Sequence, residues 1–438
     1  MAFVHPQSCE CLKSELDLFS VPPTQTSIES GSFVEYIPIA ALSDNMAIEF
    51  AISGSGQDYC DLASSQLFVR VEITKANGAA LDATSQVGPV NLLLHSLFAD
   101  VDIKLNEISI TNSNNTYPYR AYLETLLSYG PAAKNSQLTA ALYYKDTAGA
   151  MEDKNPLLDT AQKGLKTRHS FFKEGKVVDL IGCLHSDLFF QDRYLPCDVG
   201  LRIKLLRSKD SFCLMSGQAA YKIKIHECKF YTRKVKLSSS VFVAHAKALE
   251  EGNAKYPIRR VVCKTFTIPT GNLDFTQENV FAGTLPTRLV IGLLDNSAYN
   301  GNYELNPFNF RHYDLNQLKV VLDGQQQHYI SPLEPNFTAQ RYVEAYMSLF
   351  TGTGKNRKDE GTDIARTDFA AGYAIYAFDL TPDMSEDTHF NLSRDGSVRL
   401  EMKFGTALPN TVNVVVYAEF EHVIEINRDK QVLFDFAT

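Results

Sequence analysis

The chain has 438 residues, a formal net charge of −9, and hydrophobic and charged fractions of 45% and 21%, which are those of an ordinary globular protein. Its length exceeds what one hydrophobic core usually supports, so we expect two domains. No apolar run approaches the ~20 residues of a membrane helix, and the first residues lack a secretory signal pattern, so we expect no membrane span and a protein made and kept in the cytosol or nucleus.

The first ~30 residues are polar and contain Pro22-Pro23, which predicts an extended arm over residues 1–30. The first half then alternates apolar and polar residues in short runs, the period of a half-buried β-strand. In residues 67–73, for example, every odd-numbered position is apolar. Helical spacing is clear over residues 119–127, and Gly130-Pro131 ends that helix. Strands are predicted at residues 33–39, 47–52, 67–73, 101–105, 176–181, 199–205 and 221–230.

The charge is unevenly divided along the chain. Residues 160–240 carry 16 basic and 7 acidic side chains, which could form a basic surface that faces a polyanion. In residues 221–225, however, the lysines alternate with apolar residues as on the solvent-exposed face of a strand. We favour the exposed strand face and keep nucleic-acid contact as the alternative.

The character of the chain changes at residues 238–257, which combine three serines, a short helical stretch and Gly252-Asn253. We place the domain junction there because turn residues of this kind are typical of linkers. The predicted division is an N-terminal arm at residues 1–30, an N-terminal domain at 31–238, a linker at 239–257 and a C-terminal domain at 258–438.

The second half contains an aromatic loop, residues 295–313, between predicted strands at 289–294 and 318–322. The first of these strands is a run of mostly branched apolar residues, which predicts burial on both faces. The loop combines turn-forming Asn, Gly and Pro with several tyrosines and phenylalanines. Aromatic side chains at this density must pack against something, either the sheet of this subunit or the surface of a neighbour.

The second half also repeats the order of elements of the first. The helical segment YLETLLS at 122–128 matches YVEAYMS at 342–348, at an offset of 220 residues. The strands before and after each helix correspond in order, and each half closes with a further strand. A duplicated domain explains this order with one assumption. Each half is therefore predicted as an all-β unit with one main helix in a loop, most economically a sandwich of the jelly-roll type.

The sequence shows no pattern of catalytic or metal-binding residues. Eight cysteines are scattered, so we expect free thiols and no structural disulfide. The ten histidines form no HxH or HExxH motif, and no G-x-S-x-G elbow surrounds a serine. The stretch GTGK at 352–355 resembles part of a phosphate loop, but it follows a helix and lacks the full spacing, so the end of that helix is the better interpretation. We expect no enzyme activity, no cofactor and no metal.

Long segments of the C-terminal half resemble the major capsid proteins of Polinton (Maverick) elements and the related adintoviruses. The matching text is AKYPIRR at 254–260, KTFTIPT at 264–270, residues 289–313, YMSLFTGTG at 346–354, YAFDLTPD at 376–383 and VNVVVYAEFEHVIEI at 412–426. The N-terminal half, from SELDLF at 14–19 onward, is similar to the same family with less distinctive motifs. The resemblance covers essentially the whole chain.

This resemblance implies an all-β double jelly roll, two tandem eight-stranded sandwiches with a few short helices in loops. It implies a viral structural protein, a major capsid protein that forms homotrimeric, pseudo-hexagonal capsomers of an icosahedral shell around a double-stranded DNA genome. Its partners would be copies of itself, neighbouring capsomers and penton or minor capsid proteins, with direct contact to the genome left open. It would be made in the host cytoplasm, assembled in the nucleus or cytoplasm, and located in the virion. The alternative is a host-domesticated jelly-roll module that binds carbohydrate or protein.

Two aromatic segments are the candidate subunit interface: the aromatic loop and the helical segment at 342–350. Surfaces of that composition are costly to expose on a monomer and typical of contacts between subunits. We expect that replacing Tyr303 and Phe308 by Ser weakens a trimer more than it unfolds the subunit. The candidate interface residues are Tyr299, Tyr303, Phe308, Phe310, Tyr342, Tyr346 and Phe350.

Overall fold

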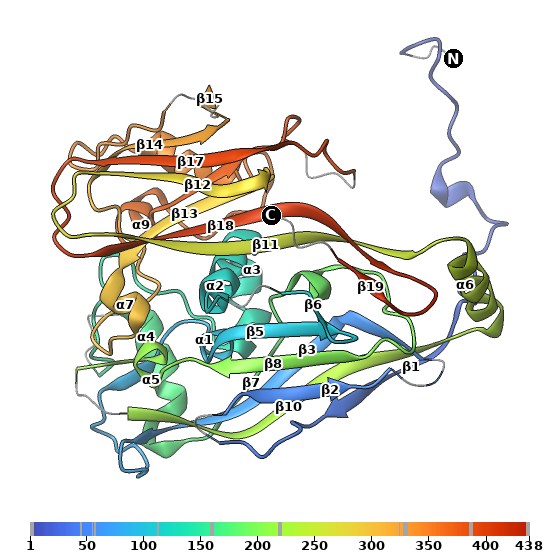
Figure 1. Ribbon diagram of the computed structural model, residues 1–438, viewed down its shortest axis with the longest axis horizontal. Helices are drawn as coiled ribbons and strands as arrows, with labels where there is room; N and C mark the ends of the chain where they lie inside the picture. The colour runs from blue at the N-terminus through green and yellow to red at the C-terminus, as the bar shows by residue number, and fades with distance from the viewer. Residues whose placement is uncertain are drawn as a thin grey trace.

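The computed structural model describes residues 4–43, 46–54, 56, 58–111, 114–157, 162–217, 221–323, 325–326, 332–384 and 389–434. Strands dominate, and short helices lie in the connections between them (Figure 1). The strands of the first half are β1 (Ile28–Tyr36), β2 (Ile48–Ile52), β3 (Asp58–Lys75), β4 (Val87–Pro89), β5 (Phe98–Leu105), β6 (Ile108–Ser109), β7 (Val178–Gly182), β8 (Leu201–Arg207), β9 (Leu214–Ser216) and β10 (Tyr221–Leu237). Those of the second half are β11 (Ala254–Ile268), β12 (Asp274–Thr284), β13 (Arg288–Asp295), β14 (Leu315–Leu322), β15 (Gln325–Gln326), β16 (Ile375–Asp379), β17 (Asp395–Phe404), β18 (Val412–Ile426) and β19 (Val432–Leu433).

The helices are short apart from α2, α4 and α6. The α-helices are α1 (Leu93–Ser96), α2 (Tyr117–Ser128), α3 (Pro131–Lys134), α4 (Lys163–Phe172), α5 (Asp210–Cys213), α6 (Ser239–Glu251), α7 (Asn296–Asn300), α8 (Val343–Thr351) and α9 (Arg366–Ala370). The 3-10 helices are η1 (Ser14–Leu16), η2 (Gln137–Ala141), η3 (Lys173–Gly175) and η4 (Asp187–Phe190).

Each half is a sandwich of two antiparallel sheets with the same strand order. The sheets are β1-β10-β3-β7 and β2-β8-β5-β6 in the first half, and β11-β18-β13-β16 and β12-β17-β14-β15 in the second. β4 and β9 form a separate two-stranded sheet, and β19 adds a short pairing to β18. With these three set aside, each half pairs its first, eighth, third and sixth strands in one sheet and its second, seventh, fourth and fifth in the other. α2 and α8 also lie at the same place, between the fifth and sixth strands of their halves. The shared strand order and helix position confirm the predicted duplication and the all-β double jelly roll.

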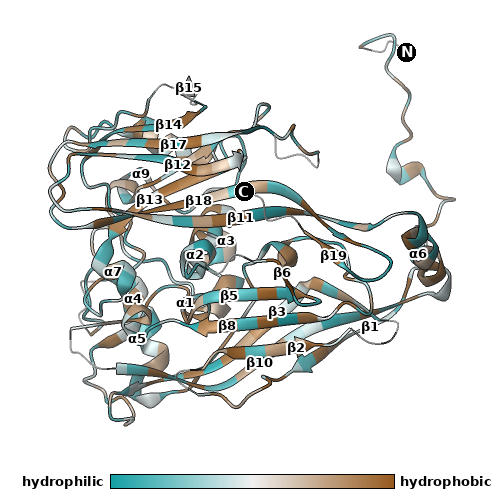
Figure 2. Ribbon diagram, viewed as in Figure 1, coloured by the Kyte–Doolittle hydropathy of each residue, from teal (hydrophilic) through white to brown (hydrophobic). Residues whose placement is uncertain are grey.

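Burial along the strands follows the alternation in the sequence. In β17, Leu400 and Met402 are buried whereas Lys403 is exposed, and hydrophilic and hydrophobic residues alternate along β8 in Figure 2. β13 is buried at every position after Arg288, because it lies between β16 and β18 and both its faces are covered. A side chain at Gly292 in this strand would collide with the ring of Phe310, so glycine there leaves room for an aromatic residue.

The predicted arm and linker differ from the structure at their ends. β1 begins at Ile28, inside the predicted arm, and the described residues before it extend away from both sandwiches (Figure 1). The predicted linker, 239–257, contains α6 and the first residues of β11, so the second sandwich begins at Ala254. Pro257 does not end the strand because β11 is an edge strand, where a missing N–H is tolerated. None of the residues of α6 is buried.

One continuous hydrophobic core runs through both sandwiches. In Figure 1 the first sandwich lies below the second, and α2 and α3 lie between them. We call this contact region the seam. Its first-half side is residues 117–157 with Arg168, His185 and Asp187, and its second-half side is β11, β18, the aromatic loop and residues 352–373. Because the two sandwiches share buried residues, they form one body rather than two tethered domains.

Candidate functional site

The aromatic loop packs into the seam, against the first half of the same chain. The rings of Phe308 and Tyr122 are stacked, with centroids 4.2 Å apart and an interplanar angle of 9°. Tyr299 stacks on Tyr119 at 5.3 Å, and Phe310 lies 6.2 Å from Tyr122. Phe308 and Phe310 have no exposed surface. The sequence predicts that this loop packs either against its own subunit or against a neighbour, and these residues contact their own subunit.

This burial corrects the prediction for two of the interface residues. Phe308 and Phe310 cannot contact another subunit while they fill the seam, and Phe308→Ser would open the core instead of selectively weakening a trimer. Tyr303 is only partly buried, but its hydroxyl donates a hydrogen bond to the carbonyl oxygen of Tyr221 at 2.8 Å. This loop therefore holds the two sandwiches together.

The remaining predicted interface residues form a separate cluster inside the second half. Tyr342 stacks on Phe337 at 5.1 Å and lies 6.1 Å from Phe369, at an interplanar angle of 21°. Tyr346 meets Phe350 edge to face at 5.2 Å. Tyr342 is buried, whereas Tyr346 and Phe350 are partly buried. The structure thus divides the seven predicted residues into two groups and does not bring them into one surface patch.

A buried network of charged side chains crosses the seam. Arg120 of α2 donates to Glu124 at 2.8 Å and to Asp187 at 2.5 Å. Asp187 also accepts a hydrogen bond from a backbone N–H of β11 at 3.1 Å, and Glu124 accepts one from the hydroxyl of Tyr417 in β18 at 3.4 Å. Burial acts to raise the pKa of Glu124, but Arg120 and His185 outweigh burial and hold this pKa below its ordinary value. Losing any partner would leave a buried charge uncompensated, so the network fixes α2 against the second sandwich.

Two lysines bind backbone carbonyl groups across the seam. Lys134 donates to the carbonyl oxygen of Leu126 at 2.7 Å and to that of Thr362, in the other half, at 2.6 Å. Burial lowers the pKa of Lys134 to about 7. Lys355 donates to the carbonyl oxygen of Ser128 at 2.9 Å, at the C-terminal end of α2, where the helix dipole favours a cation. The GTGK stretch therefore ends α8, as predicted from the sequence, and its lysine joins the second half to α2 of the first.

A fully buried ion pair lies on the first-half side of the seam. Arg168 donates to Asp146 at 2.7 Å, and neither side chain has any exposed surface. Asn306 of the aromatic loop donates to the second carboxylate oxygen of Asp146 at 3.0 Å, and the hydroxyl of Tyr373 donates to its carbonyl oxygen at 2.7 Å. Both donors come from the second half. The charges of the seam are thus engaged in holding the two sandwiches in one relative position.

Sequence reasoning missed a set of exposed apolar residues near the N-terminus. Phe19 in the arm is 96% exposed, and Phe33 in the edge strand β1 is 60% exposed. The sequence feature that could have identified them is the presence of Leu and Phe in the SELDLF segment at 14–19, where no strand is predicted. Residues of this part of the chain with exposed fractions of 60% or more are Val4, Leu12, Leu16, Leu18, Phe19, Val21, Phe33, Ile37 and Ile39.

The described residues contain no cluster of three or more His, Cys, Asp or Glu side chains placed to bind a metal ion. Among the helices that the structure describes, none combines the length and apolar character needed to cross a membrane. All eight cysteines are free, and five of them are buried.

No protein-family model matches the chain. The "Uncharacterized protein F54H12.2" of Caenorhabditis elegans is 24% identical to it over 422 residues, which are 93% of this chain and 97% of that protein.

Solved structures resemble the chain over nearly its whole length. A chain in the 3.5 Å cryo-EM structure of the Sputnik virophage has a TM-score of 0.69 and 13% identity, over 100% of this chain and 94% of that one. The VP54 protein of PBCV-1, fitted into a reconstruction of Sputnik, has a TM-score of 0.59 and 10% identity, over 96% and 100%. The mavirus major capsid protein has a TM-score of 0.54 and 13% identity, over 99% and 95%. At these identities the comparisons show the fold, a double jelly roll.

Proposed function

We propose that the chain is a viral major capsid protein of the Polinton (Maverick) and adintovirus type, which forms homotrimeric, pseudo-hexagonal capsomers of an icosahedral shell around a double-stranded DNA genome. The observation that carries this proposal is the pair of sandwiches with the same strand order, held in one body by the seam. The similarity to the mavirus major capsid protein over nearly the whole of both chains supports it.

Two similar sandwiches per chain suit a closed shell. Three chains around a three-fold axis present six similar units, which fit among neighbours as a near-hexagon. This arrangement requires that the two sandwiches keep a fixed relative position. The stacked rings of Phe308 and Tyr122 and the hydrogen bond from the backbone N–H of Val261 to Asp187 meet that requirement, because each joins residues of opposite halves.

We assign the contacts between copies to surfaces that the single chain leaves exposed. Obligate interfaces bury ~2,000 Å² or more, and apolar residues such as Phe33 are costly to leave in water. Of the aromatic residues predicted from the sequence, Phe308 and Phe310 have no exposed surface and are no longer candidates, and Tyr342, which is 8% exposed, offers little surface to a partner. The remaining candidates are Tyr299, Tyr303, Tyr346 and Phe350.

The arm is the segment that we assign to neighbouring capsomers or to penton and minor capsid proteins. Its residues 4–27, when extended, reach up to ~80 Å, which is enough to cross to another molecule. Direct contact with the genome has less support, because basic residues of β10 are engaged within the first sandwich: Lys229 pairs with Glu35 and Lys236 with Glu29, each at 3.0 Å. The protein would be located in the virion, after synthesis in the host cytoplasm and assembly in the nucleus or cytoplasm.

A host-domesticated jelly-roll module that binds carbohydrate or protein is the second candidate. The observation that favours it is a polar groove on the second sandwich, lined by residues of β14 and β17 and of the N-terminal end of α8.

The test of the capsid function is the assembly state of the purified full-length chain. Light scattering after size-exclusion chromatography should give a homotrimer of about 147 kDa, from three chains of 48.9 kDa, that persists at micromolar concentration. Negative-stain microscopy should show particles with three-fold symmetry. A variant with Phe33→Ser, matched to Phe171→Ser on another exposed site, tests whether β1 contributes to the contact. A monomer at micromolar concentration would contradict the proposal, and a monomer with saturable glycan binding would favour the second candidate.

A further inference from the structure

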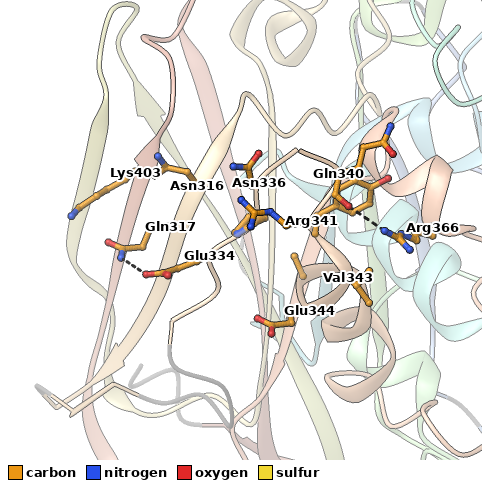
Figure 3. A pocket seen from close by; sticks show the side chains of 13 residues that line it. Asn316, Gln317, Glu334, Asn336, Gln340, Arg341, Val343, Glu344, Arg366 and Lys403 are labelled. Carbon is orange, nitrogen blue, oxygen red and sulfur yellow. Dashed lines mark hydrogen bonds between the residues drawn. The ribbon is translucent and has the colours of Figure 1, made fainter. Parts of the chain in front are cut away.

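A groove of about 820 Å³ opens on the second sandwich beside the N-terminal end of α8 (Figure 3). One wall is formed by outward-facing residues of neighbouring strands, Gln317 in β14 and Lys403 in β17, which face each other in the sheet register. The other wall is formed by Gln340 and Arg366, and Arg341 lies between the walls (Figure 3). The volume is within the ~300–1,000 Å³ range of small-molecule sites.

The backbone around Arg341 is fixed. Its N–H donates to the carbonyl oxygen of Asn336 at 2.9 Å, and the N–H of Asn336 donates to the carbonyl oxygen of Arg341 at 2.8 Å. Arg366 is also held in place, because it donates to the carbonyl oxygen of Gln340 at 3.1 Å and lies 5.6 Å from the ring centroid of Tyr342. The groove is therefore a formed site on two ordered segments.

Side-chain amides supply most of its neutral hydrogen-bonding groups. Asn316, Gln317, Asn336 and Gln340 line the groove, and an amide carries two N–H donors and a carbonyl acceptor. The Asn336 oxygen accepts from the N–H of Ala339 and the Gln317 nitrogen donates to Glu334, which leaves the Asn336 N–H donors and the Gln317 oxygen for a ligand. Adjacent hydroxyl groups on a sugar ring both donate and accept, so planar amides can pair with two of them at once. This chemistry fits a saccharide better than an apolar ligand.

The groove has an excess of positive charge although the second half of the chain is acidic. Three basic residues, Arg341, Arg366 and Lys403, line it against two acidic ones, Glu334 and Glu344. Residues 246–438 as a whole carry 18 basic and 25 acidic side chains.

Two of these cations are available to a ligand. Gln317 donates a hydrogen bond to Glu334 at 3.1 Å, which occupies one of the two carboxylates (Figure 3). Within the part of the chain that the structure describes, the guanidinium group of Arg341 and the ammonium group of Lys403 have no hydrogen-bond or ion-pair partner. Both side chains are exposed in the groove.

We propose that this groove binds an acidic saccharide, a pyranose that carries a carboxylate. Arg341 and Lys403 bind the carboxylate, and the amides of Gln317, Asn336 and Gln340 bind ring hydroxyl groups. The site is a ligand-binding function additional to shell assembly and does not depend on it, because the residues assigned to ligand contact lie outside the seam and, among the residues that line the groove, Arg366 alone falls within it.

The test uses the full-length protein and two probes that differ at one group. Methyl β-D-glucuronide carries the carboxylate, and methyl β-D-glucoside has a hydroxymethyl group in its place. Saturation-transfer NMR should detect binding of the glucuronide in the millimolar range, and the glucoside should bind about tenfold more weakly, because a charge-assisted hydrogen bond is lost.

Variants then assign the binding to the groove. Arg341→Gln and Lys403→Gln should each weaken glucuronide binding about tenfold, whereas Glu344→Gln should tighten it, because a like charge is removed from the site. Lys222→Gln, an exposed lysine on β10 of the first sandwich, is the matched control and should bind as the unmodified protein does. The opposite signs of the Arg341 and Glu344 variants are not expected from a general loss of stability.

Several outcomes would overturn the assignment. They are an absence of saturation transfer to the glucuronide, equal binding of the two sugars, or unchanged binding in both the Arg341→Gln and Lys403→Gln variants. Complete displacement by an equal concentration of acetate would show a simple anion site and would also reject the saccharide. Light scattering on the same samples reports the assembly state, so failure of this inference and failure of the capsid proposal can be told apart.

Discussion

Replacing Phe308 by Ala removes a ring that belongs to the second sandwich but is buried against the first. The ring lies 4.2, 5.9 and 6.1 Å from those of Tyr122, Tyr119 and Phe212, all residues of the first half. Loss of a fully buried Phe side chain costs about 3–5 kcal/mol of unfolding free energy. Of this, about 0.5–1.5 kcal/mol is specific to the stacked aromatic pair and should appear as coupling in a double-mutant cycle with Tyr122→Ala.

Guanidinium unfolding of the full-length protein at one fixed concentration measures the total, since the stability of an oligomer depends on concentration. Hydrogen exchange read out on β3 and β13 measures where the loss occurs. Both strands should lose protection together, because the two sandwiches share one core. Phe390→Ala is the control, since that ring is half exposed and its loss should change stability by about 0.5 kcal/mol or less. A loss under about 1 kcal/mol for Phe308→Ala, or a loss of protection in the second sandwich alone, would refute the shared core.

Four further predictions concern the register, the buried lysine, the exposed segments and the cysteines. Leu400→Asp should lower the unfolding free energy by several kcal/mol, because it buries an unpaired charge, whereas Glu401→Ala should lower it by about 0.5 kcal/mol or less; equal effects in chemical denaturation would contradict the register of β17. The pKa of Lys134 is about 7 in the folded protein and 10.5 for a free side chain, so between these pH values the unfolded chain binds more protons than the folded one. The contribution of Lys134 to the unfolding free energy is therefore fully present above pH 10.5 and is lost as the pH falls to about 7. The melting temperature should rise less steeply between pH 7 and 10.5 in Lys134→Met than in the unmodified protein. An equal dependence of the melting temperature on pH in the two proteins would contradict the buried position of Lys134. Limited proteolysis followed by mass spectrometry should cut first in the arm or around α6, which has no buried residue, and early cuts within β13 would be inconsistent with this structure. Reductant should leave the melting temperature unchanged, because all eight cysteines are free, and a fall of many degrees would reveal a disulfide.

The fold could be predicted from the sequence because its signals are local and occur twice. Period-2 alternation identifies strands such as β3 and β17 without knowledge of their partners, and the repeat at 122–128 and 342–348 fixes the equivalence of the two halves. β11 begins at Ala254, inside the predicted linker, because Pro257 lies in an edge strand, and edge position is a property of the whole sheet rather than of the residue before or after it.

The buried charges of the seam could not be predicted in the same way. Arg120 and Glu124 have the spacing of a helical ion pair, which is also common on exposed helices. Their third partner, Asp187, is 67 residues from Arg120. Lys134 binds Thr362 across 228 residues, and in the sequence it stands in a polar stretch typical of a solvated loop. The residues next to a charged side chain in the sequence do not indicate whether it is buried, because its burial depends on hydrogen-bond and ion-pair partners that are distant in the sequence.

The two copies of the main helix show why an aromatic segment alone does not identify a subunit interface. α2 and α8 occupy the same place in the two sandwiches, and both carry aromatic residues on one face. On α2, Tyr122 stacks against the aromatic loop of the other half. Tyr342, the equivalent residue at the start of α8, stacks within its own half and leaves the groove open beside it. The duplicated helix thus joins the sandwiches in one copy and borders a candidate binding site in the other. The aromatic residues indicate that they pack against another surface, and only the three-dimensional arrangement shows which surface that is.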